Sequence, residues 1–558
     1  MYRIYRYAIT LAAALMSVAA LAQNLDPTVE VSRAYEGTLV EVHKPTQVMA
    51  VPDSVQRFRL DFDYSVFDKP YKGSYEFSPY MTSMRPASSA FEPNVFYLRA
   101  GAGYRLYPVA DLIWSPAFKK GFKMDVYASH RSYVGDYRTI KPQSAVLSPD
   151  GEWKGYDLKT DAGVSGRYDW EKGVFDFDAS YLGIHSKEVE QLRGMNGLDA
   201  SFGVASKAAR TFMYEVDLDY RFADHKTAYN PVQEHFMSFD ADLGPQFKTV
   251  HKILFGMGVD MTQYAGNLDW GMARMDVTPH YVYQKGRWTV DAGVKVDFLV
   301  ASIDAETSIG ARRQQILYPD VHVEFEAVRN AMNLYVSALG GNQLNTYSDM
   351  VIRNHFADQS YLASGALDAT VERVKATLGM KGRIGTKFSY DLNAGYAGYG
   401  NMLLDGVAVT DAKLHTVVGY SGCNKAFAEL EWLLDTERFK FDGNLQYAHY
   451  WGFETVAGLF APSAFTGSTS MEYNIRKRIY FGVDCDFATG RKMIAPVLEG
   501  QAYSIPGYAD LGLSVEVLTS RKLSFWARGG NLLNMTIQRV PLYAEGGINF
   551  TVGLCVNL

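Results

Sequence analysis

The chain ends in a segment in which apolar residues occupy every second position. Within residues 547–558 the apolar positions are Ile548, Phe550, Val552, Leu554, Val556 and Leu558, and the residues between them are polar or small. A period of two gives a β-strand two chemically different faces. Because the pattern continues to the last residue, this strand needs a pairing partner, and in a closed barrel that partner is the first strand. The pattern therefore favours a closed barrel over an open sheet.

From about residue 95 the same alternation recurs in hairpins with tight turns rich in Lys, Arg and Gly, separated by longer polar loops. Ten short turns are predicted, at residues 119–121, 171–173, 206–210, 246–250, 284–287, 328–331, 381–387, 435–438, 474–478 and 519–522. Long loops are predicted at residues 135–153, 185–196, 223–234, 262–270, 340–364, 399–424, 451–467, 489–506 and 531–545.

This asymmetry of short and long connections predicts the fold class. Outer-membrane barrels have short periplasmic turns and long extracellular loops, and ten short turns join about 22 strands when both barrel ends lie in the periplasm. We therefore expect an all-β chain, a transmembrane antiparallel β-barrel of about 22 strands (range 16–22) over residues 95–558.

Residues 1–22 have the features of a secretory signal peptide. Arg3 and Arg6 precede an apolar stretch from Ala8 to Ala20, and residues 20–22 (Ala-Leu-Ala) form a small-x-small cleavage site. Beyond this leader no run of about 18 apolar residues occurs, so helical membrane spans are not expected. Together with the strand pattern, the leader places the predicted barrel in the outer membrane of a Gram-negative bacterium.

The composition argues against nucleic acid as a partner and provides few cysteines. The formal net charge of −6 argues against nucleic acid as a ligand. The three cysteines are Cys423, Cys485 and Cys555. Cys485 lies on an apolar register and Cys555 on a polar one, so these two are a poor disulfide pair and no structural disulfide is expected.

Residues 23–94 differ from the rest of the chain. Seven prolines interrupt them, and their spacing does not fit the hairpin unit. Residues 58–66 alternate perfectly, but charged residues separate the apolar positions, which suits a soluble, half-buried strand better than a barrel strand. We interpret residues 23–94 as a periplasmic or lumenal segment.

The last fifty residues resemble the C-terminal end of TonB-dependent outer-membrane receptors, in the style of the Bacteroidetes members. The resemblance is carried by residues 509–517, by residues 522–534, which end in Asn-Leu-Leu-Asn, and by the Gly-rich start of the last strand at residues 546–554. It implies a 22-strand barrel that encloses a globular plug and takes up a nutrient with the help of TonB. Here the plug is expected to be reduced or absent, since only residues 23–94 precede the first clear strand. The chain also ends in Leu558, where the family usually has an aromatic residue.

An N-terminal segment resembles a TonB box, the short extended stretch that pairs with TonB. It comprises Pro27, Thr28, Val29, Glu30, Val31 and Ser32. An ordinary extended N-terminus is the simpler interpretation of the same residues. A wide barrel leaks unless something fills it, so residues 23–94, inward-folded loops or a second protein must close the lumen.

No catalytic, cofactor or metal site is predicted. The eleven histidines are scattered without metal-ligand spacing, and no phosphate-binding loop or nucleophile elbow occurs. Two groups near strand ends contain residue types found in catalytic sites, His130 with Ser132 and Asp136, and His225 with Asp224; ordinary loop polarity is the favoured interpretation of both.

Residues that face the lumen are expected to set which solutes pass. The candidates are the acidic line of Glu215, Asp217 and Asp219, and one register of residues 290–298, either Asp291, Gly293, Lys295 and Asp297 or the residues between them. The loop aromatics Tyr399, Tyr450, Trp451 and Phe453 are interpreted as an upper aromatic girdle in preference to a ligand site.

The sequence therefore predicts an outer-membrane barrel, not an enzyme, that binds or takes up an unidentified nutrient. The expected partners are outer-membrane lipid, TonB or another periplasmic protein, and a small-molecule or glycan ligand. The alternatives are a scaffold subunit of an envelope-assembly complex and a passive porin.

Overall fold

A computed structural model of the chain describes residues 95–558, with gaps at 105–106, 119–120, 140–151, 189–190, 208–210, 228–230, 249, 267–269, 302–315, 357–366, 411–412, 455, 498–502 and 545. The predicted leader, the segment 23–94 and the TonB-box-like residues lie outside the described residues. Within the described part, no helix has the length and hydropathy of a membrane span.

Nearly all of the described chain is β-strand. The strands are β1 (Phe96–Tyr104), β2 (Val109–Trp114), β3 (Phe122–Thr139), β4 (Glu152–Trp170), β5 (Gly173–Glu188), β6 (Gln191–Ser206), β7 (Phe212–Thr227), β8 (Val232–Phe247), β9 (His251–Gly266), β10 (Gly271–Lys285), β11 (Trp288–Ala301), β12 (Leu317–Val328), β13 (Met332–Leu344), β14 (Ala369–Ile384), β15 (Phe388–Thr410), β16 (Lys413–Asp435), β17 (Phe439–Trp451), β18 (Phe465–Ile475), β19 (Ile479–Ala488), β20 (Arg491–Lys492), β21 (Ser504–Ile505), β22 (Tyr508–Leu518), β23 (Leu523–Gly530), β24 (Tyr543–Ala544) and β25 (Asn549–Asn557). One short helix, α2 (Tyr347–Arg353), interrupts them.

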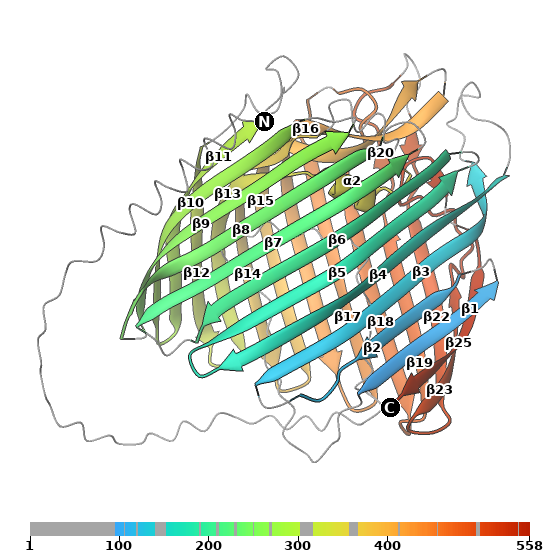
Figure 1. The fold of residues 1–558 in the computed structure, drawn as a ribbon, viewed down its shortest axis with the longest axis horizontal. Helices are drawn as coiled ribbons and strands as arrows, with labels where there is room; N and C mark the ends of the chain where they lie inside the picture. Colours follow the sequence, from blue (N-terminus) through green and yellow to red (C-terminus); the bar gives the residue numbers. More distant parts are fainter. Residues whose placement is uncertain are drawn as a thin grey trace, which may run out of the picture. The chain divides into compact units, whose positions relative to one another are not determined.

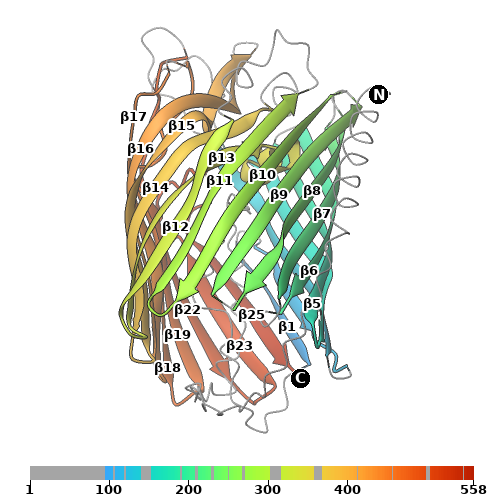
Figure 2. The same ribbon diagram turned by 90° about the vertical axis from the view of Figure 1, so that its left-hand side faces the viewer.

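The strands form one closed antiparallel barrel (Figures 1 and 2). The main sheet has 23 strands; β24 attaches to β3 alone, and the other 22 form the ring. The last strand, β25, pairs with β23 on one side and with β1 on the other. The chain end is included in this closure, because Leu558 N donates to Phe96 O at 2.8 Å and Phe96 N to Leu558 O at 2.9 Å. The predicted fold class is therefore confirmed, and the ring itself has no open edge, while β20 and β21 form a separate two-stranded sheet.

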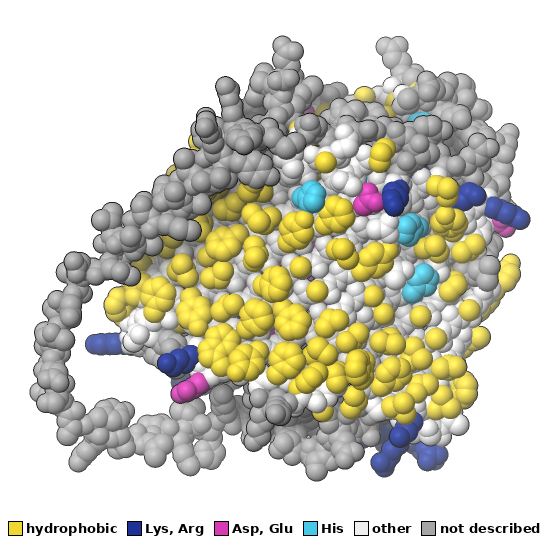
Figure 3. Space-filling view, viewed as in Figure 1, with side chains coloured by type: hydrophobic (Ala, Val, Ile, Leu, Met, Phe, Trp, Pro, Cys, Tyr) yellow, Lys and Arg dark blue, Asp and Glu magenta, His cyan; other side chains and the backbone are white. Residues whose placement is uncertain are grey.

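Alternation assigns each strand one face to the lipid and one to the lumen. On β25, Phe550 and Val552 are 53% and 61% exposed on the outer wall, whereas Thr551 and Cys555 on the opposite register are buried. Figure 3 shows the apolar side chains of one side of the barrel as a continuous belt across the wall. This is the surface that a bilayer needs, since lipid offers no partners for polar groups.

Connections differ at the two ends of the barrel. All ten predicted short turns fall between consecutive strands at one end, which we name the turn end; the opposite end, with the longer connections, is the loop end. The strands of the ring also differ in length, from 6 residues in β2 to 23 in β15 and β16. About 9–11 tilted residues cross a bilayer, so β15 and β16 extend well beyond the membrane at the loop end.

Several predicted long loops were wrong for this reason. β5 ends at Glu188 and β6 begins at Gln191, inside the predicted loop 185–196. Likewise, β15 and β16 occupy most of the predicted loop 399–424, and the predicted loops 223–234 and 262–270 are mostly strand. Strands that project into water no longer need an apolar face, so their polar composition resembled that of loops. The predictions at 340–364, 451–467, 489–506 and 531–545 match long connections.

Candidate functional site

The connection between β13 and β14, at the loop end, folds inward and contains α2. Residues 345–356, which we name the α2 segment, follow β13. The helix begins because Thr346 caps it: the side chain of Thr346 accepts from Asp349 N at 3.1 Å, and Asp349 in turn accepts from Thr346 N at 3.3 Å. Tyr347, Ser348, Met350 and Val351 are buried. A seven-residue helix is not stable alone, so its position depends on these packing contacts.

The α2 segment spans the barrel between opposite walls. Arg353 Nε donates to Asp405 Oδ1 on β15 at 2.8 Å, and His355 Nδ1 lies 2.7 Å from Asp157 Oδ1 on β4. Strands β4 and β15 are eleven strands apart (15 minus 4), which is half of the 22-strand ring. Asp405 also accepts from Arg491 Nη1 at 2.8 Å, so a second connection joins the same ion cluster.

Strands β7 and β8 also hold the helix, through polar contacts of buried side chains. Ser348 N donates to Glu234 Oε2 on β8 at 3.0 Å, and Ser348 Oγ lies 3.2 Å from His225 Nε2 on β7. Both His225 and Glu234 are completely buried. Arg221 Nη1 donates to Asp349 Oδ1 at 3.1 Å, which adds an ion pair at the same face. The segment is thus fixed to β4, β7, β8 and β15.

Apolar packing joins the α2 segment to the other long connections. Phe356 stacks on Tyr543 with ring centroids 4.3 Å apart and meets Tyr137 edge-on. Tyr543 belongs to the connection between β23 and β25. We name the α2 segment and residues 452–464, 489–507 and 531–548 together the cap; Figure 1 shows α2 at the loop end of the ring.

The other cap connections pack on one another and on β15. Phe460, Tyr503 and Ile505 form a buried cluster with Val407 of β15. Tyr503 OH donates to Gln538 Oε1 at 2.8 Å, and burial raises the pKa of Tyr503 to about 12. The cap is therefore a packed, hydrogen-bonded layer with its own small apolar core.

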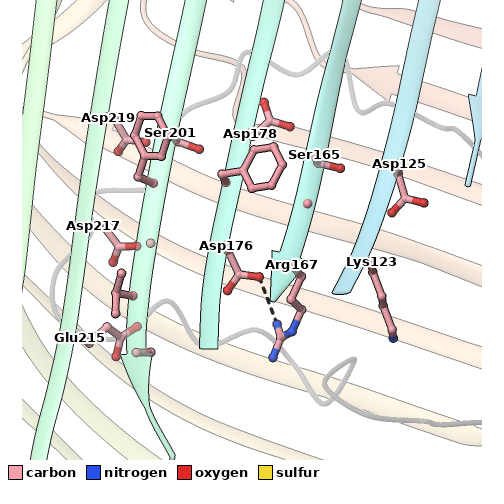
Figure 4. Close-up of a pocket in the computed structure, with 16 residues that line it drawn as sticks. Lys123, Asp125, Ser165, Arg167, Asp176, Asp178, Ser201, Glu215, Asp217 and Asp219 are labelled. Carbon is pink, nitrogen blue, oxygen red and sulfur yellow. Dashed lines mark hydrogen bonds and ion pairs between the residues drawn. The ribbon is translucent and has the colours of Figure 1, made fainter. Parts of the chain in front are cut away.

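Nearer the turn end, the lumen wall of β3–β7 is acidic and hollowed. The pocket there has a volume of about 520 Å³, and its charged lining is shown in Figure 4. We name its six acids the acidic wall: Asp125, Asp176, Asp178, Glu215, Asp217 and Asp219. Two cations, Lys123 and Arg167, lie in the same lining, and Arg167 pairs with Asp176 at 3.5 Å. The excess of carboxylates gives this part of the lumen a negative potential.

The predicted lumen residues face as the strand pattern requires. Glu215, Asp217 and Asp219 share one face of β7 and line the pocket (Figure 4). On β11 the structure selects the first of the two registers, because Asp291, Lys295 and Asp297 are buried within the wall. Val294 and Phe298 are 44% and 41% exposed on the lipid side.

The predicted aromatic girdle is correct for one residue and not for others. Trp451 is 40% exposed and packs against His449 and Tyr396 on the outer wall. Tyr399 and Tyr450 instead pack inside against the cluster of Ala397, Phe427 and Ala448. Alternation explains the difference, since Tyr450 and Trp451 are neighbours on opposite faces of one strand.

The two groups weighed as catalytic are not assembled. His130 lies between Thr160 Oγ1 (2.8 Å) and Ser132 Oγ (3.2 Å), with no carboxylate among its described hydrogen-bond partners. His225 and Asp224 are on opposite faces of β7, and His225 contacts Ser348 instead. Sequence reasoning missed the α2 segment; the one local signal was the capping box at Thr346 and Asp349.

Among the described residues, no three His, Cys, Asp or Glu side chains are grouped as metal ligands. The three cysteines are free. What the described residues of the loop end do form is a packed layer that ion pairs and hydrogen bonds join to the barrel wall.

Comparison with known proteins supports the fold. No protein-family model and no curated protein matches the sequence. Among solved structures, the chain is similar to the copper transporter OprC (10% identity, 83% of this chain and 80% of that chain, TM-score 0.58). It is also similar to the siderophore receptor PirA from Acinetobacter baumannii (10% identity, 83% of this chain and 80% of that chain, TM-score 0.59). A third similar structure is the FrpB iron transporter from Neisseria meningitidis (9% identity, 84% of this chain and 82% of that chain, TM-score 0.59). The chain has the 22-strand barrel fold of the TonB-dependent receptors, which its C-terminal residues resemble.

Proposed function

We propose that the chain is an outer-membrane uptake receptor whose lumen is closed at the loop end by its own cap. The observation that carries the proposal is the α2 segment, which joins Asp157 on β4 to Asp405 on the opposite wall. A 22-strand barrel encloses a lumen wide enough to leak unless it is plugged. A built closure favours a receptor that opens for a ligand over a passive porin.

The ligand is a small molecule that the loop end captures from outside the cell. The similar solved proteins are named for copper, siderophore and iron transport, which supports a small solute as cargo. Passage inward leads past the acidic wall, whose negative potential favours cations over anions.

Release of the cap needs energy, and TonB is the proposed source. Residues 27–32 would pair with TonB as an added strand, and residues 23–94 would serve as a reduced plug or periplasmic arm. The resemblance to TonB-dependent receptors and the extended character of Val29 and Val31 in the sequence support this.

Conductance in planar bilayers tests the closure. The full chain should give a small, stable conductance, and the double variant Arg353→Ala with His355→Ala should open frequently, because it removes both wall-to-wall bridges. Lys387→Ala, which removes an exposed cation in the turn between β14 and β15 at the turn end, is the control and should behave like the parent. A large, permanently open pore in the parent chain would overturn the proposal.

Co-purification tests the transport role. The parent chain should retain TonB, and Val29→Pro should lose it, since proline removes a strand hydrogen bond. A strain without the chain should grow poorly on the limiting nutrient. Stable periplasmic assembly partners combined with normal growth on every nutrient would instead indicate a scaffold subunit.

A further inference from the structure

The turn end of the barrel has a ring of positive charge. Nine of its ten turns contain a described Lys or Arg outside the strands. The twelve cations, which we name the basic rim, are Lys172, Lys207, Lys248, Arg287, Arg329, Lys387, Arg438, Arg476, Lys477, Arg478, Arg521 and Lys522. The same turns contain two described acids, Glu171 and Glu437, so their net formal charge is +10 (12 minus 2).

The charge is specific to this end and opposes the charge of the whole chain. The chain as a whole has a formal charge of −6. At the loop end, the described connections contain four cations against three acids. Three of these four cations are engaged in ion pairs: Arg353 and Arg491 with Asp405, and Arg539 with Asp510. These three loop-end cations therefore serve contacts within the cap and its attachment to the wall, whereas in the basic rim Lys207 donates to Trp170 O and the other eleven cations are exposed.

All the rim cations except Lys207 are exposed. Lysine or arginine in these turns is adjacent to side chains of the lipid-facing wall. Lys248 follows Phe247, Arg287 precedes Trp288, and Arg329 follows Val328; these three apolar neighbours are 49–50% exposed. Figure 3 shows Lys and Arg side chains beyond the edge of the apolar belt. A cation at the rim of a lipid-facing surface lies at the depth of lipid headgroups.

One turn keeps its charge at a conformational cost. Arg476 and Lys477 both have positive φ, 51° and 56°, and Arg478 N donates to Ile475 O at 3.0 Å across them. Two left-handed residues in succession favour Asn-Gly, and residues with long side chains are unfavourable there. Strained backbone of this kind clusters at functional sites. In this turn Arg476 and Lys477 therefore occupy two positions that Asn and Gly fit better.

We propose that the basic rim binds the phosphate groups of anionic phospholipids in the membrane leaflet at the turn end. The inference rests on the outer-membrane placement in the proposed function, and it adds a specific lipid class. Juxtamembrane Lys and Arg are each attracted to an anionic leaflet. A ring of such contacts fixes the depth and tilt of the barrel. An acidic soluble protein fits less well, because these cations border the hydrocarbon and not open solvent.

Lipid titration by native mass spectrometry of the full chain in detergent tests this. The parent should bind phosphatidylglycerol at least about tenfold more tightly than phosphatidylcholine, since several cations act together. The variant Arg476→Asn with Lys477→Gly removes two charges and suits the turn better, so it should fold as well as the parent. Its affinity for phosphatidylglycerol should fall about fivefold for each charge removed.

The matched control removes two exposed cations from the loop end, Lys226→Gln with Lys492→Gln, and should leave phosphatidylglycerol binding unchanged. Equal losses in both variants, or none in the turn variant, overturn the inference. Competition by inorganic phosphate at the same concentration would show a site for free anions and not for lipid. Loss of a bound acidic periplasmic protein with unchanged lipid binding would reassign the rim to protein docking. Each of these outcomes leaves the conductance test of the proposed function intact.

Discussion

Arg353 and His355 are separated by one residue, yet they bind carboxylates on opposite walls of the barrel. Arg353 Nε donates to Asp405 at 2.8 Å, and His355 Nδ1 lies 2.7 Å from Asp157. Two short contacts thus hold a segment across the lumen that has little local stability of its own. These ionic contacts add to the apolar packing of the cap, and single substitutions can remove them.

Asp405→Asn should loosen the cap without affecting the barrel wall. The carboxylate serves both Arg353 and Arg491 and is largely buried, so its neutralisation leaves two cations poorly compensated. Because Arg353 is one-third exposed, we expect a loss of about 2 kcal/mol in cap stability, below the range for fully buried pairs. Limited proteolysis within the α2 segment should become faster. Asp169→Asn, which breaks an exposed pair with Arg167, should leave the cleavage rate unchanged.

Gly553→Ala should weaken the seam that closes the barrel. A Cβ at Gly553 would lie 2.2 Å from the carbonyl oxygen of Ala100 on β1 and 2.5 Å from the ring of Trp526. The carbonyl oxygen of Ala100 is part of the backbone and cannot move aside as a flexible side chain can. The two strands must therefore separate locally, which should lower the folding stability by about 1–3 kcal/mol. The folded band on an unheated gel should disappear at a lower temperature. Gly512→Ala is the control, since its nearest neighbours lie at 3.5 Å or more.

Val552→Arg tests which face of β25 contacts lipid. Val552 is 61% exposed on the outer wall, and an arginine there should cost about 2–4 kcal/mol near the middle of the bilayer. Folding into vesicles, followed by denaturant titration, measures the change. Asn444→Arg, on the lumen face of β17 beside Glu431, should be tolerated. Equal costs at both positions would contradict the assigned faces.

Neutralising the acidic wall should change ion selectivity. In a chain with an opened cap, Glu215→Gln, Asp217→Asn and Asp219→Asn together remove three of the six carboxylates of the acidic wall. The preference for cations should decrease, because fewer fixed negative charges face the lumen. Reversal potentials across a salt gradient report it. Asp224→Asn, on the outer face at the loop end, should not shift the reversal potential.

The alternation of apolar and polar residues predicted the strands of the barrel wall well, because each strand shows this alternation within its own residues. The turn at Arg476, Lys477 and Arg478 was recognised from charge between two alternating stretches, and it lies where expected. The acidic line on β7 was recognised in the same way. The strand number followed, since each hairpin contributes two strands and the two ends of the ring must meet.

Pattern failed where strands leave the membrane. At residues 185–196 and 399–424 polar composition suggested loops, but the ladder continues there through hydrogen bonds between neighbours, as in the pairing of Ala408 with His415. Beyond the membrane, at the loop end, the outer face of a strand contacts water and does not need apolar side chains. The alternation of apolar and polar residues is therefore absent there, although the strands continue.

The sequence by itself determined the alternating wall, the position of its turns and the class of fold, because these depend on contacts between near neighbours and on the chemistry of lipid and water. Only the tertiary structure decided that the α2 segment contacts both β4 and β15. The contact of His355 with Asp157 joins residues 198 positions apart. No local pattern encodes which wall an inward-folding segment reaches, since that depends on the ring bringing β4 and β15 to face each other.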